Sequence, residues 1–570
     1  MTTTPRRHTS RRRLFIGLLV VGFWLTMTGL LIYRDVLGGV LRTEVVLNDE
    51  VWIEEPVETW LVITTGPTLD SADPRDQQQV GWARVRQAPE DRNEIEGALM
   101  EAEVHLQLNL LGRATALDME GTAWRARRLK EAEIDFRITS GEAEFALAGT
   151  ILGDRLQAQV QSGSETSPFD VRLPDNALFS TGFGTSLAFP ALQPGEETVV
   201  QTFDPMTLRP TRSRVRAVSR DRIEIGGETI RAVRLRVQAS GLETIAWIDD
   251  HGQVIRAETP LGLHLQKATR EQALTPIGDD PNVGELLRIT AVRPSGAQPR
   301  RGATRLLATL RSDDGRTLTI EHGTGVADIR DDGVDAPTDW AESAAPAGSA
   351  ELAVPGDFRQ RPSEGERVLL LPGDAPLNDA EARPSEEQLV ALLGADPFIA
   401  AEHPRIRAQA ESVLAEAGVA LGETTDDRRA MAFALHDWAF RHIEKVPVLS
   451  LPSALEVLES RRGDCNEHTI LYTAMARSIG LPTRVAIGLV WSDELRGFYY
   501  HAWPEIWLGD RWLATDPTLG QRVADATHIK LLEGGIERWP QLLPFLGKLE
   551  IELHSVDTSP VDAAQTPSSL

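Results

Sequence analysis

Three residue types that together can perform acyl-transfer chemistry occur in order near the C-terminal end of this 570-residue chain. The only cysteine, Cys465, is followed by His501 and then by Asp516. A thiolate is a strong nucleophile, an imidazole can take up and return a proton, and a carboxylate can hold the imidazole in one orientation. This chemistry requires the fold to bring the three side chains together. The helix and strands that carry them therefore determine whether the reaction is possible.

Cys465 is predicted to begin a helix. Gly463 breaks the preceding segment, Asp464 can cap the helix, and Glu467 can complete a capping box. Apolar residues then recur at helical spacing up to Gly480-Leu481-Pro482, where the helix should stop. At the first helical position, unpaired backbone N–H groups and the helix dipole favour a thiolate. The alternative is a small buried side chain, because free cysteine is among the most buried residue types.

His501 and Asp516 are predicted to lie on one β-hairpin. Two strand-forming runs flank Gly509-Asp510, a two-residue connection with glycine first, as in a type II′ turn. In that register Trp503 faces Asp516, and His501 points to the same face as Trp503. The carboxylate could then hold one imidazole nitrogen and leave the other for the thiol. A loop longer by one residue would separate the two side chains, and His501 alone would be taken for a surface or core histidine.

These segments resemble the core of the transglutaminase-like superfamily. The matching blocks are Gly463-Asp464-Cys465 with its helix, Gly480 to Val485, His501-Ala502-Trp503 and Trp512 to Thr518. The resemblance covers residues 385–555 and implies a papain-like α+β fold with a Cys-His-Asp triad. It implies that Cys465 is the nucleophile, that His501 is the general base and acid, and that Asp516 orients the imidazole.

The chain departs from the family pattern at Pro504, and its oxyanion hole is only partly assigned. Pro504 stands where relatives usually keep a β-branched residue, and because proline cannot donate to a β-ladder, we expect that strand to be an edge or to be kinked. The backbone N–H of Cys465 is one natural donor for an oxyanion hole. The second donor is not assigned, and Trp438 is only a weak candidate.

The N-terminal segment is predicted to be a membrane anchor. Residues 14–33 form a run of 20 residues without a charge, which is long enough to cross about 30 Å of hydrocarbon. Five arginines precede it and predict that residues 1–13 form a cytoplasmic tail. The bulk of the chain would then lie in the periplasm, anchored in the inner membrane by a single pass. The alternative is a cleaved signal peptide of twin-arginine type, which the length of the run and the missing Ala-x-Ala site disfavour.

The composition is that of a globular ectodomain behind this anchor, with 25% charged and 41% hydrophobic residues. The net charge is −25 and the only concentrated basic block flanks the anchor, so no nucleic-acid partner is expected. A single cysteine cannot form an internal disulfide. In an oxidising compartment the stability of the fold must therefore come from packing.

Strand and helix patterns predict an α+β fold in which β-rich domains precede the catalytic core. The regions predicted after the anchor are a β-rich domain at 44–270, a small β-rich domain at 283–380 with a disordered loop at 331–350, the catalytic domain at 385–555 and a disordered tail at 556–570. Period-two alternation at 104–110 and 233–237 is typical of strands. Helical spacing predicts helices at 386–393, 404–417 and 426–443.

The resulting hypothesis is a membrane-anchored, extracytoplasmic thiol enzyme with a protein or peptide substrate. Cys465 would attack an amide to form a thioester, which water resolves in a peptidase or amidase and an amine resolves in a cross-linking transglutaminase. Hydrolysis is favoured because water is always present. A non-catalytic envelope-binding or scaffold module is the third possibility. No metal or organic cofactor is needed, and the spacing of His403, His436, His442 and His468 matches no metal-site pattern.

Overall fold

The computed structural model of the chain falls into two compact units, one within residues 55–277 and one within residues 291–558. The described residues are 55–65, 78–110, 113–127, 131–141, 143–163, 165–173, 178–179, 192–205, 208–239, 242–250, 253–259, 263–277, 291–312, 319–321, 353–355, 359–363, 367–377, 383–396, 398–446, 453–534, 542 and 547–558. The predicted anchor at 14–33 and the predicted loop at 331–350 lie outside them. Among these residues, no helix is long and apolar enough to cross a membrane.

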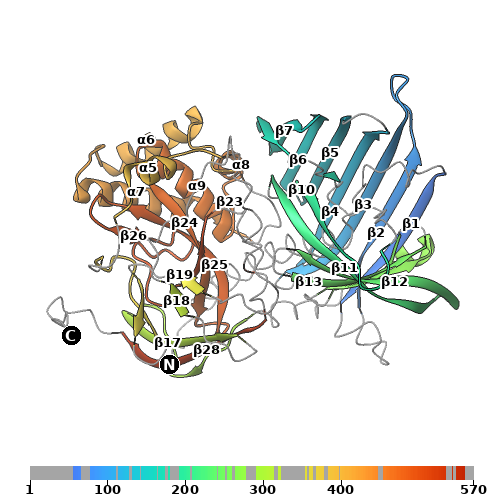
Figure 1. Cartoon of the computed structure of the whole chain (residues 1–570). Coiled ribbons are helices and arrows are strands. Elements are labelled where there is room, and N and C mark those ends of the chain that lie inside the picture. Colours follow the sequence, from blue (N-terminus) through green and yellow to red (C-terminus); the bar gives the residue numbers. More distant parts are fainter. Residues whose placement is uncertain are drawn as a thin grey trace, which may run out of the picture. The chain divides into compact units, whose positions relative to one another are not determined.

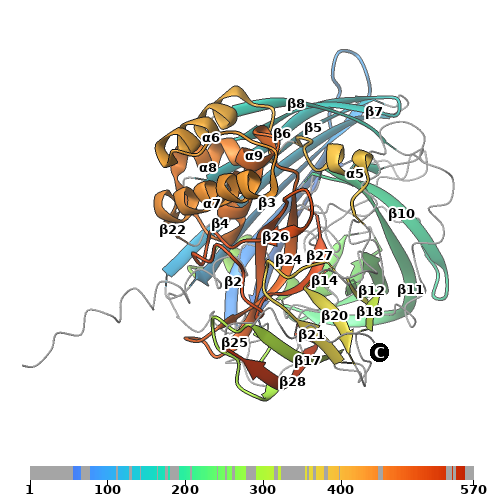
Figure 2. The same cartoon turned by 90° about the vertical axis from the view of Figure 1, so that its left-hand side faces the viewer.

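The first unit is built on one 15-stranded sheet, whose strands run β8-β7-β6-β5-β4-β3-β2-β1-β15-β14-β13-β12-β11-β10-β9 (Figures 1 and 2). The strands are β1 (Val57–Thr65), β2 (Gln78–Pro89), β3 (Gly97–Leu110), β4 (Arg113–Ala126), β5 (Glu131–Ser140), β6 (Ala143–Leu152), β7 (Arg155–Ser162), β8 (Glu165–Arg172), β9 (Leu178–Phe179), β10 (Glu197–Asp204), β11 (Arg209–Ile225), β12 (Glu228–Ala239), β13 (Leu242–Asp249), β14 (Val254–Glu258) and β15 (Leu263–Ala268). A short helix, α3 (Arg270–Ala273), follows.

Sequence alternation explains this sheet. In β5 buried and exposed side chains alternate along the strand, because successive residues of a strand point to opposite faces. The alternating runs at 104–110 and 233–237 lie in β3 and β12, so both strand predictions are confirmed. Gly226 and Gly227 both have positive φ in the turn between β11 and β12, a conformation that glycine adopts without strain.

The second unit contains a four-stranded sheet of order β26-β25-β24-β27 and a five-stranded sheet of order β16-β28-β17-β21-β20. The first comprises β24 (Thr483–Ser492), β25 (Gly497–Trp507), β26 (Trp512–Ala514) and β27 (Ile529–Glu533). The second comprises β16 (Ser295–Gly296), β17 (Arg305–Ser312), β20 (Gln360–Ser363), β21 (Arg367–Leu370) and β28 (Leu549–Asp557). Two short pairs are β18 (Thr319–Glu321) with β19 (Ala353–Pro355) and β22 (Glu444–Lys445) with β23 (Arg462–Gly463).

The small β-rich region and the end of the chain share one sheet. Strand β28 pairs antiparallel with β17, from Arg305 opposite Asp557 to Ser312 opposite Leu549. The first residues of the predicted tail, which begins at 556, therefore lie in a strand. The rest of that tail, from 559 on, is outside the described residues.

Four of the five described helices of the second unit begin and end close to the predicted positions, whereas a helix at Ala454–Ser460 was not predicted. The five are α5 (Glu386–Ala391), α6 (Pro404–Ala417), α7 (Thr425–His442), α8 (Ala454–Ser460) and α9 (Cys465–Ser478). Helices α6, α7, α8 and α9 share one hydrophobic core with Ile506, Leu508 and Leu513 of the β25–β26 hairpin. Burying each large apolar side chain stabilises such a core by roughly 1.5–3 kcal/mol. This core fixes α9 against the sheet.

Strand β25 is not an edge strand, contrary to one expectation from Pro504. It lies between β24 and β26, and Pro504 pairs with Val485 of β24. The carbonyl of Pro504 accepts the N–H of Thr515, just after β26 ends at Ala514. In a β-strand the N–H and C=O of one residue point to the same neighbouring strand, which for Pro504 is the β26 side. The hydrogen bond that proline cannot donate would therefore lie beyond the last residue of β26, and the ladder loses nothing.

Candidate active site

Cys465 is the first residue of α9, as predicted. The Asp464 side chain accepts the N–H of Asn466 at 3.0 Å, and the Glu467 carboxylate accepts the N–H of Asp464 at 2.7 Å. Gly463 is required before this cap, because a Cβ there would lie 2.2 Å from the Cβ of Glu467. The capping box and the helix start are therefore confirmed.

The thiol of Cys465 does not have the lowered pKa that its place at a helix start suggests. The side chain is completely buried, and this burial, helped by the negative charges of Asp464 and Glu467, raises its pKa well above the ordinary value. The backbone N–H of Ala502 lowers the pKa of Cys465, but by less than burial raises it. Loss of hydration is therefore the largest influence on the pKa of Cys465, and it favours the protonated thiol.

The backbone of Ala502 attaches β25 to the first turns of α9. Its carbonyl accepts the hydroxyl of Thr469 at 3.1 Å, and its N–H acts on the sulfur of Cys465 to lower the pKa of that thiol. Ala502 directly follows His501 in β25. Helix α9 and strand β25 are thus joined by a hydrogen bond close to both Cys465 and His501.

His501 and Asp516 meet across the predicted hairpin. The pairs Glu505 with Ala514 and Trp507 with Trp512 set the register, and the N–H of Leu508 donates to the carbonyl of Arg511. This is the register predicted from the Gly509-Asp510 turn. Nε2 of His501 lies 2.8 Å from Oδ2 of Asp516, and both side chains are completely buried.

A tight turn holds the carboxylate of Asp516. Its Oδ1 accepts the N–H groups of Thr518 at 2.9 Å and of Leu519 at 2.8 Å. The backbone of Asp516 also exchanges two hydrogen bonds with Gln521. Burial alone would raise the pKa of Asp516, but the contacts with His501 and a second histidine outweigh it and hold that pKa well below the ordinary value.

The ring of His501 is held by its contact with Asp516. Because an ionised carboxylate can only accept, Nε2 carries the hydrogen that faces Asp516, and in the neutral ring Nδ1 then has the lone pair. Burial lowers the pKa of His501, and the opposing effect of Asp516 does not restore it. The indole of Trp503 stacks on this ring with centroids 6.2 Å apart. The resting His501 is therefore a neutral base.

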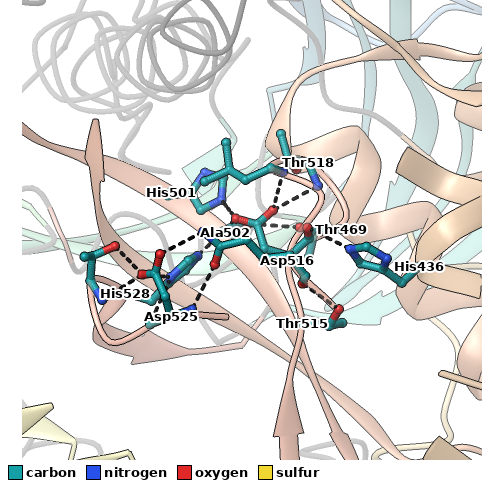
Figure 3. A network of polar contacts seen from close by, with 12 residues as sticks. His436, Thr469, His501, Ala502, Thr515, Asp516, Thr518, Asp525 and His528 are labelled. Atoms are coloured by element: carbon teal, nitrogen blue, oxygen red, sulfur yellow. Dashed lines mark hydrogen bonds and ion pairs between the residues drawn. The ribbon is translucent and has the colours of Figure 1, made fainter. Parts of the chain in front are cut away.

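The second histidine, His528, was not predicted. Its Nε2 lies 3.0 Å from the same Oδ2 of Asp516, so one oxygen serves two imidazoles (Figure 3). His528 directly precedes β27, which pairs with β24 on the far side of the sheet from β26. No motif marks it in the sequence. Only the order of the strands would have placed it next to Asp516.

Two other histidines have different partners. Nδ1 of His468 is hydrogen-bonded to the carbonyl of Asp464 at 2.6 Å, and burial lowers its pKa to about 3. Nε2 of His436 donates to the backbone carbonyl of Asp516 at 3.2 Å, opposite the side on which His501 and His528 lie (Figure 3). His468 is thus tied to its own helix, and His436 supports the turn that holds Asp516.

The ligand atoms of His501, Asp516 and His528 lie within 4.8 Å of one another, a spacing that a metal site would also have. A metal would need the lone pairs of the two ring nitrogens that face Asp516. Both of these nitrogens instead donate hydrogens to Oδ2, at 2.8 and 3.0 Å. The three residues therefore form a hydrogen-bonded network, and we do not assign them as metal ligands.

Residues 416–517 match the family model of the transglutaminase-like superfamily. The matched segment contains Cys465, His501 and Asp516, which confirms the resemblance found in the sequence. A comparison with curated proteins finds no match.

Two solved structures are similar over part of the chain. A β-barrel-like protein of a domain of unknown function from Brucella abortus is 10% identical, with a TM-score of 0.27, and the match covers 40% of this chain and 96% of that one. A candidate cysteine protease from Cytophaga hutchinsonii is 14% identical, with a TM-score of 0.22, and the match covers 37% of this chain and 78% of that one.

Proposed function

Because residues 416–517 belong to the transglutaminase-like superfamily, we propose that the protein is a thiol enzyme of acyl transfer that cleaves an amide bond of a protein or peptide. Cys465 is the nucleophile, His501 carries the proton, and Asp516 orients His501. The observation that carries this proposal is the hydrogen bond from Thr469 of α9 to the carbonyl of Ala502, which joins the helix of Cys465 to the strand of the His501–Asp516 pair.

The acylation step starts from a neutral pair. Nδ1 of His501 takes the proton from the thiol while Sγ of Cys465 forms a bond to the amide carbonyl carbon. The oxyanion that results is stabilised by the backbone N–H of Cys465 at the start of α9. His501 then returns the proton to the departing amine as the C–N bond breaks. The products are a thioester on Cys465 and a free amine.

The deacylation step reverses these roles. His501 takes a proton from a water molecule, the hydroxyl attacks the thioester carbonyl, and the thiolate of Cys465 leaves and recovers a proton. Asp516 stabilises the imidazolium of His501 in both steps without itself taking the proton. Hydrolysis is our choice over cross-linking because water needs no binding site of its own.

The cross-linking transglutaminase remains the second candidate, since an amine can resolve the same thioester. The non-catalytic envelope module is the third. The test uses envelope extract from cells lacking the protein, incubated with the full chain or with Cys465→Ala. The hydrolase predicts new protein N-termini, detected by mass spectrometry, that require Cys465. Incorporation of a fluorescent primary amine without new N-termini would point to the transferase. If neither signal appears, the result favours the non-catalytic scaffold module.

We also propose that residues 14–33 anchor the protein in the inner membrane, with the catalytic unit in the periplasm. The support is the uncharged run of 20 residues behind five arginines. The test is alkaline extraction of membranes followed by protease treatment of spheroplasts. Retention in the membrane with digestion from outside is expected. Release by alkali, or protection from the protease, would contradict the proposal.

A further inference from the structure

Both ring nitrogens of His528 face atoms that can only accept hydrogen bonds. Nε2 lies 3.0 Å from Oδ2 of Asp516. Nδ1 lies 3.2 Å from the backbone carbonyl oxygen of Asp525 and 3.5 Å from its Oδ1. A neutral imidazole has one N–H and one lone pair, so it could satisfy only one of these positions. An imidazolium, with two N–H groups, satisfies both.

The two carboxylates around His528 are held in their ionised form. Oδ1 of Asp525 accepts the backbone N–H of Thr527 at 2.8 Å. Its Oδ2 accepts the N–H of Gly302 and the side-chain amide of Gln521, each at 2.8 Å. Asp516 accepts two backbone N–H groups on its Oδ1 in the same way. Donors of this kind stabilise the charged carboxylate, so neither aspartate supplies a proton to His528.

The geometry points to His528 as a positioning residue of the active site: a buried imidazolium between Asp525 and Asp516 that fixes Asp516 and shares its Oδ2 with His501. This inference rests on the proposed function, because it assigns the work of His528 to the base of that reaction. Figure 3 shows the chain of contacts from Asp525 through His528 and Asp516 to His501.

Groups from several elements face His528 and hold it in place. The ring of His501 on β25 lies 5.9 Å away, and the indole of Trp503 meets the ring of His528 edge to face at 5.1 Å. The guanidinium of Arg359, which precedes β20, donates to the backbone carbonyl of His528 at 2.8 Å. Burial lowers the pKa of His528, and the bonds to Asp516 and Asp525 more than compensate, so that its pKa is raised overall.

The charge of His528 has a consequence for the base. Asp516 by itself would raise the pKa of His501 and favour its protonated form. The imidazolium of His528 neutralises part of that carboxylate's charge and repels a proton on His501, and the positive charge of Arg301 also lowers the pKa of His501. Burial is the main cause of the lowered pKa of His501, and the charge of His528 adds to it, so His501 stays neutral at rest and able to take the thiol proton. Asp516 still orients it through the shared Oδ2.

The test compares the full chain with its His528→Gln and His554→Gln variants. His554 is a matched control because its ring bonds Thr309 in the sheet of β17 and β28. NMR of ring-labelled histidine, assigned with the variants, reports the protonation of each ring. We expect His528 to be doubly protonated at pH 7. We expect the pKa of His501 to rise in His528→Gln and to stay unchanged in His554→Gln.

Enzyme assays give a second readout. For His528→Gln we expect kcat to fall about tenfold or more with little change in KM, as for a misplaced catalytic group. The acid limb of the pH profile should move to higher pH, because that limb reports protonation of His501. A merely structural role would lower the folded fraction without moving either the limb or the pKa of His501.

A neutral ring of His528 at pH 7 would overturn the inference, and this measurement on the unmodified chain needs no variant to fold. An unchanged or lower pKa of His501 in a folded His528→Gln would also overturn it. Neither NMR measurement needs a substrate. A wild-type protein that cleaves nothing would therefore contradict the proposed function and leave the result on His528 standing.

Discussion

The hydroxyl of Thr469, one turn into α9, donates a hydrogen bond of 3.1 Å to the backbone carbonyl of Ala502 in β25. This bond joins the helix that starts with Cys465 to the strand that carries His501. Both partners are completely or almost completely buried. The relative position of Cys465 and His501 therefore depends on a polar contact between other residues of the same helix and strand.

Replacing Thr469 by valine should damage activity more than a nearby matched change. Thr469→Val leaves the buried carbonyl of Ala502 without this donor, at a cost of about 1–3 kcal/mol in the free energy of unfolding. The matched control is Thr473→Val, one turn along α9, because the hydroxyl of Thr473 has no hydrogen-bond partner among the described residues. Urea unfolding and kcat should show a loss for the first variant and almost none for the second. Equal effects would contradict this role of Thr469.

Asp516→Asn should abolish most activity while preserving the shape of the side chain. An uncharged amide has a single acceptor oxygen, so it cannot accept from the two histidines and also from the backbone N–H groups of Thr518 and Leu519, and His501 loses its orienting charge. By analogy with other triads we expect kcat to fall by about 10⁴-fold. Near-UV circular dichroism should confirm that the variant is folded. A folded variant that kept a tenth of the activity would show that Asp516 does not orient the base.

His468 should make the catalytic unit less stable in acid. Its pKa is about 3 in the folded protein because of burial, against about 6.5 in an unfolded chain. As pH falls below about 6.5, the unfolded state binds a proton that the folded state does not. Stability present above that pH is then lost, by about 1.4 kcal/mol per pH unit, down to about pH 3.

His468→Gln removes this titration. Urea unfolding of the wild type and the variant between pH 7 and pH 4 should therefore give different slopes of stability against pH, with the variant less sensitive to acid. His442→Gln is the control, because that histidine is exposed. Parallel slopes for wild type and His468→Gln would show that His468 titrates normally in the folded protein.

Glu505→Gln should destabilise the fold without touching Cys465, His501 or Asp516. Glu505 is completely buried and accepts from Arg484 at 2.7 Å and from Lys530 at 2.8 Å. Removing one charge of a buried pair leaves the others uncompensated, which costs about 3–5 kcal/mol. Glu459→Gln, which breaks the exposed pair with Arg405, should change stability little. Comparable urea midpoints for the two variants would contradict this.

The sequence predicted the local parts of the site because its signals there are local. The cap at Asp464 and Glu467 determined where α9 begins, and the Gly509-Asp510 turn determined the register that places His501 beside Asp516. Both features depend on residues only a few positions apart. The family match at 416–517 agrees with the same segments.

What the sequence did not predict depends on contacts between distant segments. His528 reaches Asp516 because β27 joins the sheet beside β24, and Arg359 reaches the backbone of His528 from the turn just before β20, a strand of another sheet. The pKa of Cys465 was predicted in the wrong direction, because helix position can be read from a motif whereas burial depends on everything packed around it. The joining of β17 with β28 likewise has no local signal.

The most direct test of the Cys465–His501 pair is the rate at which iodoacetamide alkylates Cys465 at neutral pH, measured by mass spectrometry in the full chain. With its pKa raised by burial, the thiol should need His501 to lose its proton. The account predicts that His501→Ala slows alkylation at least tenfold, whereas His468→Ala alkylates at nearly the wild-type rate. Alkylation of His501→Ala as fast as the wild type would contradict it.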